Sequence, residues 1–158
     1  KLLFHKLEEV LAQKRLQQKT SAADALHDVA ESIHKRSLVI VFSDMFETGN
    51  DAENLFKALQ HLKHNKHEVI LFHVVDKRKE LEFTFENRPY KFVDIETGDE
   101  VKVHSNQVRS AYLESVNNYK KQLMEKCTQY RIDFVEADIH AGFKQVLLPY
   151  LVKREKMM

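Results

Sequence analysis

The chain has 158 residues, enough for one domain with a single hydrophobic core. Lys and Arg total 25 and Asp and Glu total 24, so the net charge of +1 gives no electrostatic argument for nucleic-acid binding. No apolar run reaches the roughly 18 residues of a membrane-spanning helix. The single Cys127 has no partner for an internal disulfide, which predicts a reducing, cytoplasmic location.

Two helices are predicted before the first strand. Residues 1–18 place apolar side chains at helical spacing, and the chain opens on Lys1 inside this pattern, which suggests a piece of a longer protein. A polar break at Thr20 and Ser21 follows. Residues 22–35 form the second predicted helix, with Leu26 and Ile33 on its apolar face.

The stretch from Leu38 to Phe42 is entirely apolar and is followed by Ser43 and Asp44. Such a run predicts a strand buried on both faces, as in a parallel sheet covered by helices. Ligands of these sheets bind outside the carboxyl ends of the strands. Ser43 and Asp44 are therefore the first residues to consider for a functional site.

A helix over residues 51–64 and a second apolar strand over 68–75, ending at Asp76, complete a predicted strand–helix–strand unit. Residues 81–103 then alternate apolar and polar side chains in three segments, 81–85, 90–94 and 100–103. We interpret this region as an inserted antiparallel β-meander. Its aromatic residues are expected to cover the domain's own core, and the alternative is that they face a partner protein.

Ser105 is a plausible N-cap for a long helix that runs to about Tyr130 and carries one continuous apolar stripe. Residues 131–137 predict a short strand near the edge of the sheet, and residues 142–153 predict a final helix that contains Pro149. The whole chain is thus predicted to be one α/β domain: a three-layer, doubly wound, mostly parallel sheet with a small antiparallel insert.

Asp44 is the main candidate for chemistry. A carboxylate at a strand end suits Mg²⁺ or Mn²⁺, and Thr20 or Ser21 would supply a second oxygen ligand. The alternative is structural, with Asp44 capping the following turn and Thr20 or Ser21 capping a helix.

Three histidines, His61, His64 and His67, fall within seven residues. They favour a zinc site only if all three converge, whereas histidine near a helix C-terminus is also favoured by the helix dipole. His73 is interpreted as a hydrogen-bonded core residue and Cys127 as a buried, inert thiol. No glycine-rich phosphate loop and no G-x-S-x-G motif is present.

Several ordered blocks resemble one family. They are residues 25–31 (Ala-Leu-His-Asp-Val-Ala-Glu), residues 36–44 and residues 67–76, followed by Thr97-Gly98, Ala111-Tyr112-Leu113 and Tyr150-Leu151. From about Thr20 to Leu151 the chain resembles the C-terminal part of the bacterial domain-of-unknown-function 58 proteins. That family is similar to the von Willebrand factor type A domain, so the resemblance implies a partial domain of this type.

The resemblance implies a metal-ion-dependent adhesion site built from a D-x-S-x-S loop, a Thr and a later Asp. Thr20 and Asp44 fall where the last two are expected. The D-x-S-x-S loop would lie upstream of Lys1, and Met45 replaces the usual Gly after the Asp. The site would therefore be incomplete here, with Mg²⁺ expected only in a full-length protein.

The family often accompanies MoxR-type AAA+ ATPases, which implies a partner in assembly or maturation of a complex. We therefore expect a non-enzymatic protein-interaction module with no catalytic residues. The alternative is a metal-dependent hydrolase or phosphotransfer enzyme that uses Asp44. Because the family's first strand would lie upstream of Lys1, the strand Leu38 to Phe42 is expected to have an unpaired edge and to favour a homodimer.

Overall fold

The computed structural model describes residues 2–12, 22–45, 50–94 and 98–156. Its centre is a parallel sheet of three strands, β1 (Leu38–Ser43), β2 (Glu68–Val75) and β5 (Asp133–Asp138), in the order β1-β2-β5. Within the described residues the strands follow one another across the sheet in the same order as along the chain. The predicted α/β class is confirmed, and β5 is an edge strand as expected.

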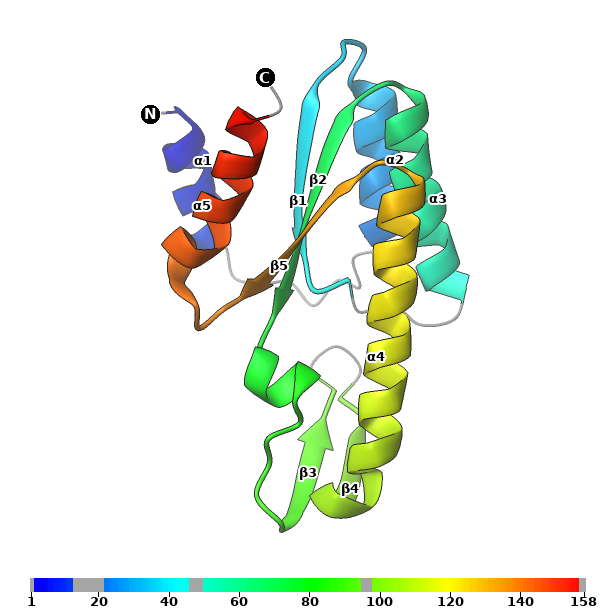
Figure 1. Ribbon diagram of the computed structural model, residues 1–158, viewed down its shortest axis with the longest axis vertical. Helices are drawn as coiled ribbons and strands as arrows, with labels where there is room; N and C mark the ends of the chain where they lie inside the picture. The colour runs from blue at the N-terminus through cyan, green and yellow to red at the C-terminus, as the bar shows by residue number, and fades with distance from the viewer. Residues whose placement is uncertain (1, 13–21, 46–49, 95–97, 157–158) are drawn as a thin grey trace.

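Helices cover the two faces of this sheet in Figure 1. On one face lie α2 (Ala22–Ser32), α3 (Asn50–His64) and α4 (Ser105–Gln129). On the other lies α5 (Gly142–Glu155), and α1 (Leu2–Ala12) is drawn on that same side. The molecule therefore has the three layers that the sequence predicts.

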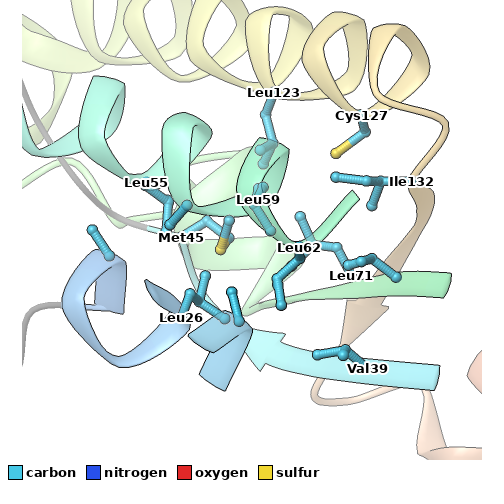
Figure 2. Close-up of a cluster of buried hydrophobic side chains, with 14 residues drawn as sticks. Leu26, Val39, Met45, Leu55, Leu59, Leu62, Leu71, Leu123, Cys127 and Ile132 are labelled. Atoms are coloured by element: carbon cyan, nitrogen blue, oxygen red, sulfur yellow. The ribbon is translucent and has the colours of Figure 1, made fainter. Parts of the chain in front are cut away.

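The hydrophobic core fills the space between the sheet and the layer of α2, α3 and α4 (Figure 2). Each element contributes the apolar stripe or alternate strand residues that its sequence pattern marks. The labelled core side chains are Leu26, Val39, Met45, Leu55, Leu59, Leu62, Leu71, Leu123, Cys127 and Ile132. The small Ala30 and Ala58 are also buried there.

The prediction that β1 is buried on both faces is wrong. Val39 points into the core, but Leu38, Ile40 and Phe42 are 44%, 49% and 64% exposed. The reason lies in the opposite layer, because α5 contacts mainly β5 and places Tyr150 edge-on against Phe72 of β2. Among the described residues, nothing covers the outer face of β1 in the same way.

The insert contains two strands rather than the three predicted. β3 (Pro89–Val93) and β4 (Glu100–His104) form an antiparallel pair away from the main sheet. The first predicted strand, residues 81–85, is wrong. Residues Lys77–Leu81 form a single π-helical turn, η1, and the N–H groups of Glu82 and Thr84 bond to the carbonyls of Lys77 and Arg78. Local hydrogen bonds thus replace the sheet ladder.

Aromatic rings join the insert to α4. Phe85 packs on both Tyr90 and Phe92, at ring-centroid distances of 5.2 and 5.5 Å. Phe83 connects Phe85 to Tyr112 of α4, at 4.8 and 4.7 Å. These rings therefore pack on one another and on α4, as a cluster separate from the main core that they were expected to cover.

Ser105 does not cap α4, contrary to prediction. It is the first residue of the helix and is buried, and its Oγ donates a hydrogen bond to the Glu86 carbonyl at 2.7 Å. The N-cap position belongs to His104, which makes no side-chain cap bond. Ser105 therefore ties the helix start to the loop that leads into β3.

Candidate functional site at the carboxyl edge of the sheet

The turn after β1 presents Asp44 at the carboxyl edge, where the sequence predicts it. Met45 next to it is buried with φ 55°, an unusual conformation for a residue other than glycine. The Met45 N–H donates to Ser43 Oγ at 3.0 Å, and Tyr119 Oη of α4 donates to the Met45 carbonyl. This reversal buries the Met45 side chain and leaves Asp44 exposed.

His73 lies beneath this turn, on the core side of β2. It is buried, and its ring hydrogen-bonds the Asp44 backbone, which confirms the prediction of a core histidine. Burial lowers the pKa of His73, although the Asp44 backbone and the nearby Glu136 carboxylate oppose that shift. Nδ1 has no hydrogen-bond partner among the described residues. His73 is therefore held as a neutral ring near neutral pH.

Asp76 closes β2 and organises the turn that follows. Its Oδ1 accepts the Lys79 N–H at 3.1 Å, and its Oδ2 lies 3.3 Å from His140 Nε2. Burial acts to raise the pKa of Asp76, but the Lys79 N–H and His140 outweigh it and hold that pKa below its ordinary value. Asp76 is thus a carboxylate with its oxygens already engaged.

Glu80 completes the group of ionisable side chains here. Its Oε2 accepts the Asp76 N–H at 3.1 Å, while its own N–H donates to the Asp76 carbonyl at 2.7 Å. Burial raises the pKa of Glu80, and the charges of Asp76 and Asp44 push it the same way, against the hydrogen bond from Asp76. We call Asp44, His73, Asp76, Glu80 and His140 the carboxyl-edge cluster.

The carboxyl-edge cluster is not a complete metal centre. No group of three His, Cys, Asp or Glu side chains that could hold a metal ion occurs in the described ranges. Thr20, the second predicted ligand, lies outside those ranges, as does Ser21. The described residues alone therefore do not make up the Mg²⁺ site that the resemblance implies.

The other histidines do not converge on one point. His61 meets His27 of α2, with the two Nδ1 atoms 3.1 Å apart. His67 is buried and accepts the Ser37 N–H on Nδ1 at 3.2 Å, whereas His64 is exposed. Each ring has its own surroundings, so they form no shared zinc site.

Sequence reasoning missed Asp76, Glu80 and His140. Asp76 was within reach, because it follows a buried strand just as Asp44 does, and parallel strands end at one edge. Glu80 and His140 occupy turns whose paths depend on tertiary packing, so no sequence signal marks them.

Cys127 is buried against the core, as predicted. Burial raises the pKa of its thiol to about 11. The thiolate that a nucleophile needs is therefore scarce at neutral pH.

A cleft of about 310 Å³ lies at the opposite, amino edge of the sheet. Two ion pairs line it: Arg154 with Glu68 at 2.8 Å, and Lys153 with Asp133 at 2.7 Å. The Arg154 guanidinium holds the pKa of Glu68 below its ordinary value. These pairs fasten the last turn of α5 to the starts of β2 and β5, so we interpret the cleft as structural.

None of the described helices combines the length and apolar composition that crossing a membrane requires. Comparison with curated proteins finds no match, and neither does comparison with solved structures. The model of one family, described as protein of unknown function DUF58, matches residues 2–122. This match spans α1 through most of α4, including β1, Asp44 and the whole insert. The chain therefore belongs to the DUF58 family.

Proposed function

We propose that this chain is a non-enzymatic protein-interaction module of the von Willebrand A-like type, acting with a MoxR-type AAA+ ATPase in assembly or maturation of a complex. The observation that carries the proposal is the apolar outer side of α5. Its members, which we call the α5 outer surface, are Leu148, Leu151 and Val152, all exposed.

The inner side of α5 is already occupied. Tyr150 packs against Phe72, and Arg154 pairs with Glu68. The helix α5 therefore carries large apolar side chains on its exposed side as well as on the side that faces the sheet. Contiguous exposed apolar side chains mark interaction sites. The α5 outer surface is therefore better suited to contact with a protein partner than to contact with water.

The enzymatic alternative has less support. Asp76 and Glu80 at the carboxyl edge hydrogen-bond each other's backbone, and Asp76 also faces His140. Asp44 would have to recruit a metal with ligands outside the described ranges.

The proposal is tested by pull-down of a purified MoxR-type ATPase from the source organism, with and without Mg²⁺. We expect capture by the native chain and its loss in Leu148→Glu and Leu151→Glu, which place charge on the α5 outer surface. Val101→Glu is the matched control, because Val101 is equally exposed but lies on β4 of the insert. Capture that survives both α5 substitutions would refute this surface.

Asp44→Ala separates the two functional classes. An interaction module loses at most the Mg²⁺-dependent part of its partner binding. A hydrolase or phosphotransfer enzyme loses turnover while circular dichroism shows an intact fold. Phosphatase and phosphodiesterase activity of the native chain towards generic chromogenic substrates, abolished by Asp44→Ala, would overturn the proposal.

A further inference from the structure

The cleft at the amino edge of the sheet carries an excess of positive charge. It lies between the last turns of α3 and α5 and the starts of β2 and β5. Its charged lining residues are the basic Lys63, Arg131, Lys153 and Arg154 and the acidic Glu68 and Asp133. Four cations and two carboxylates leave two positive charges without a counter-charge in the cleft. The excess is local, because the whole chain has a net charge of only +1.

The structural role of the cleft rests on only two of these cations. Lys153 and Arg154 pair with carboxylates at the starts of β5 and β2. Lys63 and Arg131 make no ion pair with any residue that the structure describes. Lys63 is half-buried, whereas Arg131 is exposed. A concave surface with excess charge of one sign concentrates ligands of the opposite sign. The cleft is therefore suited to an anion.

Arg131 occupies a backbone position that usually holds glycine. Its φ is 54°, its N–H bonds to the Thr128 carbonyl at 3.1 Å, and the Ile132 N–H bonds to the Cys127 carbonyl at 2.8 Å. These two bonds form the Schellman motif that ends α4, with Arg131 at the left-handed position. Glycine adopts this conformation without strain, and other residues do not. The turn itself therefore gives no reason for an arginine.

The same motif ends α3, with Lys66 at the left-handed position. Its φ is 62°, its N–H bonds to the Lys63 carbonyl at 3.0 Å, and the His67 N–H bonds to the Leu62 carbonyl at 3.2 Å. The helix dipole favours a cation at the end of both helices. Lys66 is exposed and is not one of the described residues that line the cleft. Lys66 is therefore a matched control for the role of Arg131 in the cleft.

We propose that this cleft binds a small phosphorylated molecule, whose phosphate group contacts Lys63 and Arg131. A phosphate monoester carries a charge of about −1.5 to −2 at neutral pH, which balances the excess in the cleft. A guanidinium bonds two phosphate oxygens at once, and an ammonium adds a compact charge. The volume of about 310 Å³ lies at the lower end of the range for small-molecule sites.

The end of α4 does not prevent anion binding. A helix C-terminus by itself disfavours an anion, because its last carbonyls point outward. Here the Cys127 and Thr128 carbonyls already accept the capping hydrogen bonds. The excess positive charge of the cleft then acts on the ligand. This site goes beyond the proposed function, because it uses neither the α5 outer surface nor an ATPase.

Titration of the native chain with inorganic phosphate tests the proposal, at about pH 7.5, where phosphate is mostly dianionic. Ionic strength is kept constant with chloride, and binding is followed by the amide signals in ¹H–¹⁵N NMR spectra. We expect saturable shifts at Arg131 and its neighbours. Arg131→Gly should weaken binding about tenfold or more, because one charge-assisted hydrogen-bonding group is lost. Lys66→Gly removes the same charge outside the cleft and should change the affinity less than about twofold.

Both glycine variants keep the backbone of their turns, so each should fold at least as well as the native chain, which circular dichroism checks. Lys63→Gln should also weaken phosphate binding, whereas Lys57→Gln, at an exposed position of the same helix, should not. Equal weakening in Arg131→Gly and Lys66→Gly would show a general effect of surface charge and refute the site. Absence of saturable binding of phosphate, pyrophosphate and glycerol 3-phosphate would also overturn the proposal.

A lipid headgroup is the other source of a phosphate group. Sedimentation with phosphatidylcholine vesicles, with and without phosphatidic acid, distinguishes it from a soluble ligand. We expect saturable binding of the soluble phosphates and no sedimentation with either vesicle. Sedimentation with the phosphatidic acid vesicles that Arg131→Gly abolishes, without saturable binding of soluble phosphate, would assign the cleft to a membrane surface and refute a small-molecule site.

Discussion

Leu59→Ala tests whether the layer of α2, α3 and α4 closes over a single core. Leu59 of α3 is 1% exposed and belongs to the cluster shared by all three helices and the sheet. The substitution removes three carbon atoms, which is worth about 2.4 kcal/mol in transfer free energy at about 0.8 kcal/mol each. The cavity left behind adds a further part, so we expect a loss of about 3–4 kcal/mol.

Leu148→Ala is the matched control for this substitution. Leu148 is 60% exposed on α5, so its truncation should lose less than half of the transfer free energy lost in Leu59→Ala, about 1 kcal/mol. Urea unfolding followed by circular dichroism at 222 nm gives both free energies of unfolding. For a chain of this size the core variant should also melt about 6–16 °C lower. Equal losses in the two variants would refute the packing described for α3.

Three further outcomes follow from the ionisable groups. Because the folded-state pKa of His73 lies below its unfolded value, its contribution to stability is present above pH about 6.5 and is lost as pH falls towards the folded pKa. His73→Gln should therefore reduce the change in the free energy of unfolding, measured with urea, between neutral and mildly acidic pH. His64→Gln, at an exposed position, should leave that change as it is in the native chain. Asp76 has a depressed pKa, so its contribution is present above its ordinary value and disappears as pH falls through the folded value. Asp76→Asn should therefore destabilise the chain at pH 7 and cost much less in strong acid, and equal costs at both pH values would contradict the assignment. Cys127 should resist alkylation at pH 8 in the native chain and react once urea unfolds it, because its thiol pKa is about 11; fast native alkylation would show that the helix does not bury it.

Long, strongly patterned segments were predictable from the sequence. The bounds predicted for β2, 68–75, coincide with the observed strand, because a strand covered on both sides is apolar at nearly every position, as β2 is from Val69 to Val75 with the exception of His73. The apolar stripe of α4 likewise predicted a helix close to the observed Ser105–Gln129. The exposure of β1 was not, since Ile40 and Phe42 look identical in sequence whether or not a helix covers them. The outer face of β1 is exposed because α5 lies over β2 and β5 instead.

Local hydrogen bonds account for the other failures. The alternation around Phe83 and Phe85 mimics a strand, but the Asp76 carboxylate draws in the Lys79 N–H and starts a π-helical turn instead. Ser105 has the composition of a cap, yet its hydroxyl finds the Glu86 carbonyl. In the site, Asp44 was found from the strand that precedes it, whereas His140 reaches Asp76 only through tertiary packing.

The helix α4 links two regions that share no strand. Its early turns contact the insert through Tyr112, and its later turns place Leu123 and Cys127 in the core that α3 also lines. A molecule that binds β3 and β4 therefore also stabilises α4, whose later turns are part of the hydrophobic core. A molecule that binds only the folded insert should raise the melting temperature of the whole chain, as ligand linkage requires.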